Sequence, residues 1–460
     1  MASKKLKIAF VHPDLGIGGA ERLIVDAALG LQKLGHSVDI YTSHHDPGHC
    51  FEETRDGTLR VHYVVPPFPR AIQGKLHIVF AHARQLHLTL HLLAPGAPKY
   101  DVYFVDQLST CVPLLRTFGR TRVLFYCHFP DKLLADGAYV EGRTRPRGSL
   151  LKRIYRLPMD FVEETTTKQA DTILANSRFT AGVFRRHMPS IRVTPRVVYP
   201  GINIEMYKPP KISQNDPTWL KPCRTDRPTL LSLNRFEAKK NAALAIEAFA
   251  QLRKQIAQSS RSALIVSPGG YDPRLKDNVD TLESLLSLTT SHVLTYVVVT
   301  PSTSSVPLPT LPALSTAATN GSANVLFLLN FSSAQRSALL TAPSTLVLLY
   351  TPANEHFGIV PSVVESPESE KTGWLRRPEP SVWAETLSAV ISLPQAERVR
   401  LAENARRRAR ARFGMEAMAR DMEAALLDTV ALGPVGTPAW VWAMVAALLG
   451  VVAVLVQMLL

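Results

Sequence analysis

Four short segments of the chain carry residues that could bind a phosphorylated ligand or a sugar. The first is the glycine-rich run Asp14-Leu-Gly-Ile-Gly-Gly-Ala-Glu-Arg22, in which Gly18 and Gly19 let the backbone turn tightly into a helix. Exposed backbone amides at such a helix start suit a phosphate or a sugar oxygen. Glu21 stands at the third glycine position of the dinucleotide-binding fingerprint, so the run also fits an ordinary strand-to-helix turn.

The second segment, Phe125-Tyr-Cys-His-Phe-Pro-Asp131, ends an apolar run. Ligands of parallel sheets bind beyond the carboxyl ends of the strands, so we expect His128 at a binding cleft. Its ring can hydrogen-bond a sugar hydroxyl there. A structural histidine is the competing interpretation, because one histidine alone is a weak signal.

The third segment, Asn234-Arg-Phe-Glu-Ala-Lys-Lys-Asn241, follows another strand-like run. Arg235 and Lys240 can converge on a diphosphate, whose negative charge grows as it departs as a leaving group. The same residues also fit a solvated basic turn, since lysine and arginine are mostly surface residues.

The fourth segment is Tyr350-Thr-Pro-Ala-Asn-Glu-His-Phe-Gly-Ile-Val-Pro361. Its Glu355 lies where a strand should end, so the carboxylate could bond sugar hydroxyls and stabilise developing positive charge. An acidic residue is also favourable at a helix N-terminus without any catalytic role.

The elements that must position these residues follow a parallel α/β rhythm. Apolar runs of strand length occur at Lys7–Val11, Val38–Thr42, Asp101–Val105, Arg122–Cys127, Thr172–Ala175 and Arg196–Tyr199, and again at Thr229–Leu233, Ala263–Ser267, His292–Val299, Asn324–Leu329 and Thr345–Tyr350. The pattern predicts two Rossmann-like domains at 1–208 and 229–432, joined by a proline-containing linker at 209–228 and facing across a cleft that binds the ligands.

Composition narrows the choice of partner. The formal charge of +14 suits a nucleic acid, a phosphorylated substrate or an acidic lipid surface. No nucleic-acid recognition module is evident, so we expect no nucleic acid as partner. The four cysteines are widely spaced, which argues against a disulfide framework and a zinc module.

Two apolar segments bear on the membrane. Ala439–Leu460 contains no charged residue and is long enough for one transmembrane helix. Arginines precede it, so the positive-inside rule predicts the folded body on the cytosolic side. Leu76–Leu93 is interrupted by histidines and an arginine, and is expected to be an interfacial or cleft-lining helix without a metal site. Thr300–Ser322 is expected to be a loop.

The motifs taken together resemble the retaining GT-B glycosyltransferases of group 1 (family 4). Within that group the chain is most similar to the dolichol-linked oligosaccharide mannosyltransferases of asparagine-linked glycosylation. The segments that carry the resemblance are FVHPDLGIGGAERLIVDAA, YCHFPD, ANSRFT, VVYPGI, NRFEAKKN and YTPANEHFGIVP. The resemblance implies GDP-mannose as donor and a dolichol-diphosphate oligosaccharide as acceptor, with successive α-1,3 and α-1,6 transfers at the cytosolic face of the endoplasmic reticulum membrane. Membrane lipids and sister mannosyltransferases are the other implied partners.

The resemblance also assigns roles to individual residues. Gly18 and Gly19 would line the cleft, and His128 would contact the transferred mannose. Arg235 and Lys240 would hold the diphosphate of GDP, so neither a metal ion nor another cofactor is expected. Retention of configuration would follow front-face attack, with the departing phosphate oxygen helping to take the proton of the acceptor.

The chain departs from the family pattern after Pro361. Glu355 matches the first glutamate of a paired-glutamate motif, but Val363 stands where the family has the second. About 20 family residues, enough for a helix and a strand, have no counterpart between Pro361 and the Thr372-Gly-Trp-Leu375 turn. Two further hypotheses therefore accompany the mannosyltransferase one: a catalytically impaired membrane scaffold subunit, and another lipid-acceptor glycosyltransferase.

Overall fold

The computed structural model describes most of the chain as two compact units. The described residues are 4–73, 76–134, 150–207, 225–255, 264–299, 323–352, 364 and 368–436. The first unit contains the described residues up to Ile202 and those from Ala411 onward. The second contains the described residues from Asn203 to Arg410.

The first unit is built on a parallel sheet with the strand order β3-β2-β1-β4-β5-β6-β7 among its described residues. Its strands are β1 Lys7–His12, β2 Ser37–Thr42, β3 Arg60–Tyr63, β4 Val102–Asp106, β5 Arg122–Cys127, β6 Thr172–Ala175 and β7 Arg196–Val197. Its helices are α1 Gly19–Lys33, α2 His77–Leu92, α3 Val112–Thr117, α4 Asp131–Leu134, α5 Leu150–Thr167, α6 Arg178–His187 and α13 Met415–Ala431, with the 3-10 turn η1 Glu52–Thr54.

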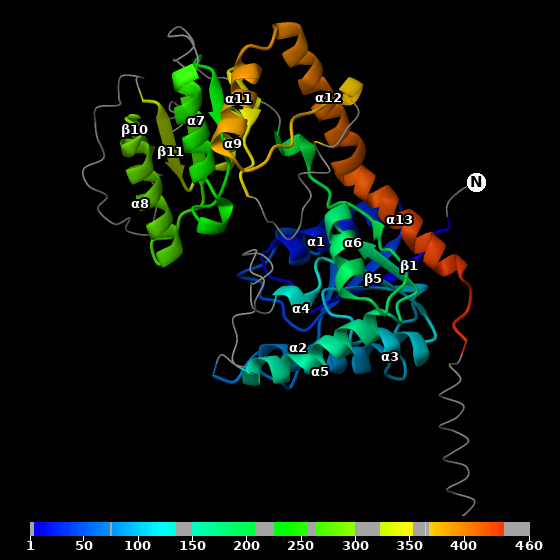
Figure 1. The fold of residues 1–460 in the computed structure, drawn as a ribbon. Coiled ribbons are helices and arrows are strands. Elements are labelled where there is room, and N and C mark those ends of the chain that lie inside the picture. The colour runs from blue at the N-terminus through cyan, green and yellow to red at the C-terminus, as the bar shows by residue number, and fades with distance from the viewer. Residues whose placement is uncertain are drawn as a thin grey trace, which may run out of the picture. The chain divides into compact units, whose positions relative to one another are not determined.

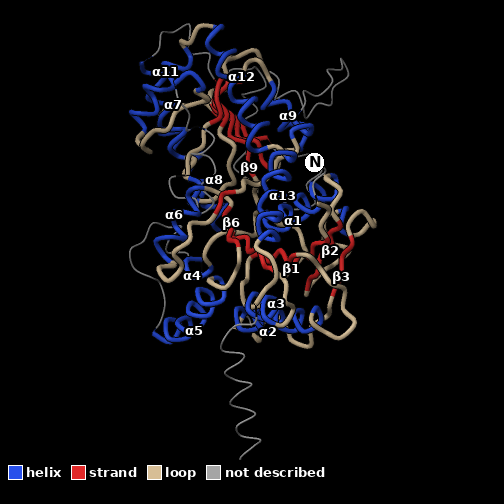
Figure 2. Tube along the Cα trace, turned by 90° about the vertical axis from the view of Figure 1, so that its right-hand side faces the viewer, coloured by secondary structure: helices blue, strands red, loops and turns tan. Residues whose placement is uncertain are grey.

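Alternate residues of β1 face two separate cores, as the two-residue period of a strand requires. Ile8 and Phe10 pack with α1 and α13, whereas Ala9 and Val11 pack with α2 and α3. Figure 2 shows these two pairs of helices on opposite sides of the red strands. Because both faces are covered, the interiors of the central strands β1, β4 and β5 are apolar on both faces.

Helix α13 comes from the far end of the chain but completes the core of the first unit (Figure 1). A Cβ on Gly30 of α1 would lie 2.7 Å from the Cβ of Ala419 in α13, so glycine permits this close approach. Arg122 donates hydrogen bonds to the carbonyls of Leu432, Gly433 and Pro434. The structure therefore differs from the expected boundary at 432, since residues from Ala411 belong to the first unit.

The second unit has a smaller parallel sheet with the order β10-β11-β9-β8-β12 among its described residues. Its strands are β8 Thr229–Leu231, β9 Leu264–Gly269, β10 Tyr296–Val299, β11 Val325–Leu329 and β12 Thr345–Leu348. Its helices are α7 Ala243–Gln255, α8 Lys276–Ser291, α9 Ser333–Thr341, α11 Pro380–Ile391 and α12 Gln395–Phe413, the last running into the first unit, with the 3-10 turns η2 Ile204–Tyr207, η4 Ala238–Lys240 and η7 Glu368–Glu370. Helices α7, α8 and α11 share one core, and α9 packs on another.

The predicted α/β class with two parallel sheets is confirmed, and every predicted apolar run overlaps a strand. Leu76–Leu93 is a helix as expected, and its Leu88 and Leu92 pack in the first unit's core. Predictions for Ala439–Leu460, for Thr300–Ser322 and for most of the 209–228 linker lie outside the described residues. Among the helices that the structure describes, none is long and apolar enough to cross a membrane.

Candidate functional site

Three ionisable side chains meet where β1, β4 and β5 end in the first unit. His12 Nδ1 lies 2.7 Å from Asp106 Oδ1, and His128 Nε2 lies 2.8 Å from Asp106 Oδ2. The three residues come together because β4 pairs with both β1 and β5, so that the carboxyl ends of these strands are neighbours. This is the edge of a parallel sheet at which ligands bind.

The deeper part of this cluster is an ion pair. His12 and Asp106 are fully buried, whereas the side chain of His128 is 12% exposed. Burial alone lowers the pKa of His12, but the adjacent Asp106 carboxylate more than offsets it, so the pKa is raised. Burial alone raises the pKa of Asp106, but the two histidines bring it below its usual range. Both shifts favour a charged His12 beside a charged Asp106.

Further contacts hold His128 in place. Its ring packs against the ring of Tyr126 with 5.0 Å between centroids, and the Asn176 side-chain amide donates to its carbonyl at 2.9 Å. Asp106 contacts Nε2, so Nδ1 is the ring nitrogen that remains for a ligand. The structure thus puts His128 directly after β5, with one ring nitrogen engaged by the protein.

The glycine-rich turn has the predicted form. Gly18 is the N-cap of α1 and Gly19 its first residue. A Cβ on Gly18 would lie 2.1 Å from Glu21 Oε2, so the Glu21 carboxylate lies against this helix start, where the helix dipole favours an anion. The charge of Glu21 also contributes to the raised pKa of His12. A Cβ on Gly19 would meet nothing within 4 Å, so the backbone there is open to a ligand.

In the second unit a pocket of about 540 Å³ lies beyond the ends of β8, β9 and β11. It is lined by Leu233, Asn234, Arg235, Gly270, Asn330 and Phe331. The side chain of Arg235 is 74% exposed and lies 3.6 Å from the Glu237 carboxylate. A cation held this loosely can turn toward an anionic ligand at little cost in lost contacts.

Lys240 belongs to the same turn as Arg235 but does not line this pocket. The Thr351 hydroxyl donates to the Lys240 carbonyl at 2.7 Å and accepts from the Asn234 amide at 3.1 Å. These bonds fix the turn to the chain just after β12. The structure therefore brings Arg235 and Lys240 onto one anchored turn, while Glu355 lies outside the described residues.

Several residues that shape the site were not predicted from the sequence. The backbone N–H of Tyr271 donates to the Asn330 side chain at 2.7 Å, and that side chain donates back to the Tyr271 carbonyl at 2.8 Å. Asn330 itself is left-handed, with φ 50°. A glycine pair after an apolar run, Gly269-Gly270, was the available signal for this wall of the pocket.

His12 and Asp106 were missed for a different reason. Each is the last residue of its strand, just beyond a run of apolar residues. A polar residue at that position was the available signal, because parallel strands end at the ligand-binding edge. Among the described residues no group of three or more His, Cys, Asp and Glu side chains is arranged to hold a metal ion.

Comparison with known sequences gives consistent matches. Residues 17–206 match the sequence model of the protein family Glycosyltransferase Family 4. The alpha-1,3/1,6-mannosyltransferase ALG2 of Rhizomucor pusillus is 43% identical, with 93% of this chain and 93% of the relative covered. The protein of the same name from Saccharomyces cerevisiae is 39% identical, with 91% of this chain and 84% of the relative covered.

Solved structures show the same fold at low sequence identity. A glycosyltransferase from Rickettsia africae has a TM-score of 0.59 and 12% identity, covering 93% of this chain and 99% of its own. Anabaena Alr3699/HepE, solved in complex with UDP, has a TM-score of 0.57 and 15% identity, covering 92% of this chain and 100% of its own. These likenesses show a GT-B-like α/β glycosyltransferase fold.

Proposed function

Because this chain belongs to the alpha-1,3/1,6-mannosyltransferase family, we propose that it transfers mannose during assembly of the N-glycan precursor. The donor is GDP-mannose. The acceptor is a dolichol-diphosphate oligosaccharide carrying one mannose and then two, elongated first by an α-1,3 and then by an α-1,6 linkage. The observation that carries this proposal is 43% identity to a relative of that name over nearly the whole length of both chains.

The pocket of the second unit supports the donor assignment. A leaving GDP gains negative charge on its diphosphate, and cationic side chains on a fixed turn stabilise that charge. Arg235 lines the pocket, and Lys240 follows on the same turn. In this proposal the two side chains do the work of a metal ion at the diphosphate, and Glu355 bonds hydroxyls of the mannose.

The first unit supplies the groups proposed for the sugar and the acceptor. Nδ1 of His128 accepts a hydrogen bond from a hydroxyl of the transferred mannose, because Nε2 is taken by Asp106. The acceptor binds against the accessible backbone at Gly19. The acceptor hydroxyl attacks from the face on which GDP leaves, and the departing phosphate oxygen takes its proton, so that configuration is retained.

We further propose that Ala439–Leu460 anchors the enzyme in the endoplasmic reticulum membrane with both units on the cytosolic side. The segment contains no charged residue, and arginines precede it in the chain. The chain's net charge of +14 suits contact with acidic lipid headgroups. Protease protection in sealed microsomes tests this topology, since both units should be digested without detergent.

Activity is tested with membranes from cells that express this chain but lack their own enzyme. GDP-mannose and the one-mannose dolichol-diphosphate acceptor are supplied, and the released glycans are separated by chromatography. We expect two- and three-mannose products in succession. UDP-glucose and UDP-N-acetylglucosamine serve as competing donors, and transfer from either in preference to GDP-mannose would favour another lipid-acceptor glycosyltransferase.

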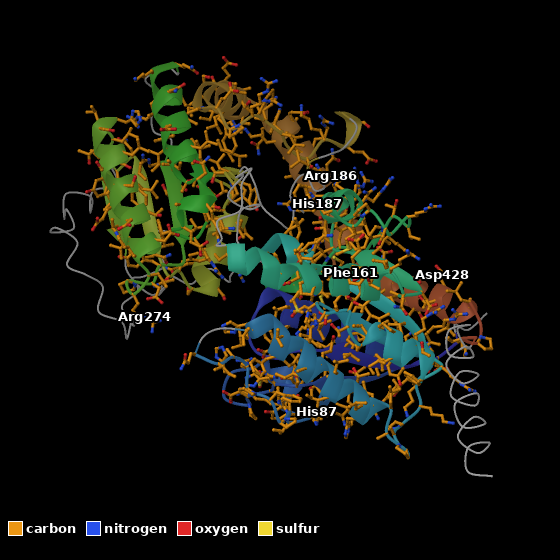
Figure 3. All side chains as sticks on the ribbon, turned by 60° about the horizontal axis from the view of Figure 1, so that its bottom comes forward. His87, Phe161, Arg186, His187, Arg274 and Asp428 are labelled. Carbon is orange, nitrogen blue, oxygen red and sulfur yellow. The ribbon has the colours of Figure 1, made fainter. Side chains whose placement is uncertain are left out.

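A matched pair of arginines makes the donor assignment specific. Arg235→Ala removes a charge-assisted contact worth about 1.5–3 kcal/mol, so kcat/KM for GDP-mannose should fall about 10- to 150-fold. Arg274→Ala is the control, because Arg274 is also highly exposed and also pairs with a carboxylate two residues away, Asp272. Figure 3 labels Arg274 on the surface of the second unit. Equal losses in the two variants would contradict the donor assignment.

A membrane scaffold subunit is the second candidate, and the observation that favours it is Val363 at the position of the family's second glutamate. A scaffold would be needed in cells for its partners' activity but would not depend on the donor site. Complementation distinguishes the two functions. Arg235→Ala and Glu355→Ala should both restore glycosylation in an enzyme-deficient strain less well than the unaltered chain, whereas full restoration by both variants would establish the scaffold.

A further inference from the structure

We infer that Asp106 and His12 are positioning residues, which together fix the ring orientation and the tautomer of His128. The inference rests on the proposed function, since it deepens the role given there to His128. Neither residue touches the proposed substrate in this arrangement. Both act through the one nitrogen of His128 that faces the protein.

The hydrogen-bond geometry supports this role. An ionised carboxylate only accepts hydrogen bonds, and each oxygen of Asp106 faces one imidazole nitrogen, at 2.7 Å for His12 and 2.8 Å for His128. Nε2 of His128 must therefore carry a proton. In the neutral ring Nδ1 is then unprotonated, and it can accept a hydrogen bond from a sugar hydroxyl. Without Asp106 either tautomer would be available.

His12 stabilises the buried carboxylate of Asp106. Asp106 is completely buried, and an isolated charge there would be strongly disfavoured. His12 provides the opposite charge from β1, and Glu21 of α1 adds a further attraction for a proton on His12. Among the described residues, the charge of Asp106 also acts on Cys111, the N-cap of α3, and on Tyr126 of β5, and burial raises the pKa of both. They stay neutral, so His12 and His128 are the partners of the carboxylate.

A purely structural role is the alternative, and the chain provides a control for it. Asp171 is also a buried carboxylate bonded to two cationic side chains, Arg116 at 3.0 Å and Arg122 at 2.6 Å. It precedes β6, at the end of the sheet opposite to His128. Asp171→Asn should therefore disturb the fold in a similar way without reaching His128.

The test compares the full-length chain with its Asp106→Asn variant. An asparagine presents one acceptor oxygen and one donor NH2 group, so one of the two rings must change the protonation of its facing nitrogen. We expect kcat to fall about 100-fold, with KM for GDP-mannose changed less than about threefold. Asp171→Asn should keep kcat per folded molecule.

Double substitution separates action through His128 from independent action. If Asp106 acts through His128, Asp106→Asn should cause no further loss once His128→Ala is present. If the two losses multiply, Asp106 acts by another route and the inference is overturned. Loss of kcat per folded molecule in Asp171→Asn equal to that in Asp106→Asn would overturn it as well.

A measurement that needs no substrate keeps this inference separate from the proposed function. The chain is labelled with 15N-histidine, and the His128 signals are identified by their loss in His128→Gln. We expect the Nε2–H tautomer in the unaltered chain, and the appearance of Nδ1–H in an Asp106→Ala variant, which has no side-chain acceptor for Nε2–H. An Nδ1–H tautomer in the unaltered chain would refute the inference whatever the activity. Absence of mannose transfer together with the expected tautomer would refute only the proposed function.

Discussion

Gly269, the last residue of β9, is the glycine at which an added methyl group should destabilise the second unit most. An added Cβ would lie 2.2 Å from the Asn234 carbonyl oxygen and 2.8 Å from the Phe236 ring. Carbon and oxygen normally approach to about 3.3 Å, so something must move by about 1 Å. Gly269 itself is held from the other side, because Asn330 N–H donates to its carbonyl at 2.8 Å. The strain therefore falls on the turn that carries Arg235.

The magnitude follows from the rigidity of these neighbours. Overpacking a core costs about 1–3 kcal/mol, and the upper part of that range applies because the clash is with backbone. For a unit of this size about 3 kcal/mol lowers the melting temperature by about 6–12 °C. Gly270→Ala is the matched control, since its Cβ would meet only Arg235 Cγ, at an ordinary 3.7 Å. Its effect on stability should be close to zero.

Thermal unfolding followed by tryptophan fluorescence measures the difference. Trp383 of α11 packs against the core of the second unit and reports on that unit. We expect Gly269→Ala to melt well below both the unaltered chain and Gly270→Ala. Equal melting temperatures for the two variants, within about 1 °C, would refute the steric reasoning, because that is less than 1 kcal/mol on this scale.

Two further predictions concern buried carboxylates of the first unit. Burial raises the pKa of Glu163 from 4.5 to about 7, so the folded state binds more protons than the unfolded state between these values and stability falls as pH rises through that window. Glu163→Gln should make the melting temperature depend less on pH. If the melting temperatures of the variant and the unaltered chain differ by the same amount at pH 5 and pH 8, the prediction is wrong. Asp171→Asn breaks buried pairs to Arg116 and Arg122 and should cost about 3 kcal/mol in chemical denaturation, whereas a loss below about 1 kcal/mol would indicate that water screens them.

Secondary structure was largely predictable because the interiors of the buried strands are mostly apolar. Thr172–Ala175 was located to the residue, since both of its neighbours in the sheet are strands and its interior is buried. Arg60–Tyr63 was missed because it is an edge strand that is mostly exposed, and therefore has no continuous apolar run. The predicted run Arg196–Tyr199 was too long, since only its first two residues pair with β6.

From the sequence, site residues could be predicted only where the residue type itself suggests a role in binding. His128 follows β5 and contacts a buried carboxylate, and Arg235 lies in the turn after β8 and lines a pocket. The pairing of His128 with Asp106 could not be predicted from spacing, because the two residues lie at the ends of neighbouring strands that a helix separates in the chain. The role of Gly269 depends on a 2.2 Å approach to Asn234, which only the folded chain reveals.

The return of α13 to the first sheet has a consequence for the order in which the chain can fold during synthesis. Met418, Met422 and Leu426 belong to the same core as Ile8 and Phe10, although the whole second unit is translated between them. The nascent N-terminal part therefore exposes the apolar surface that α13 later covers, including part of α1, until α13 has been made. The described residues of the second unit all lie between Asn203 and Arg410, so this unit can complete its folding before α13 is made. A chaperone that binds exposed apolar helices during translation should accordingly be found on ribosomes that have passed α1 but not yet α13.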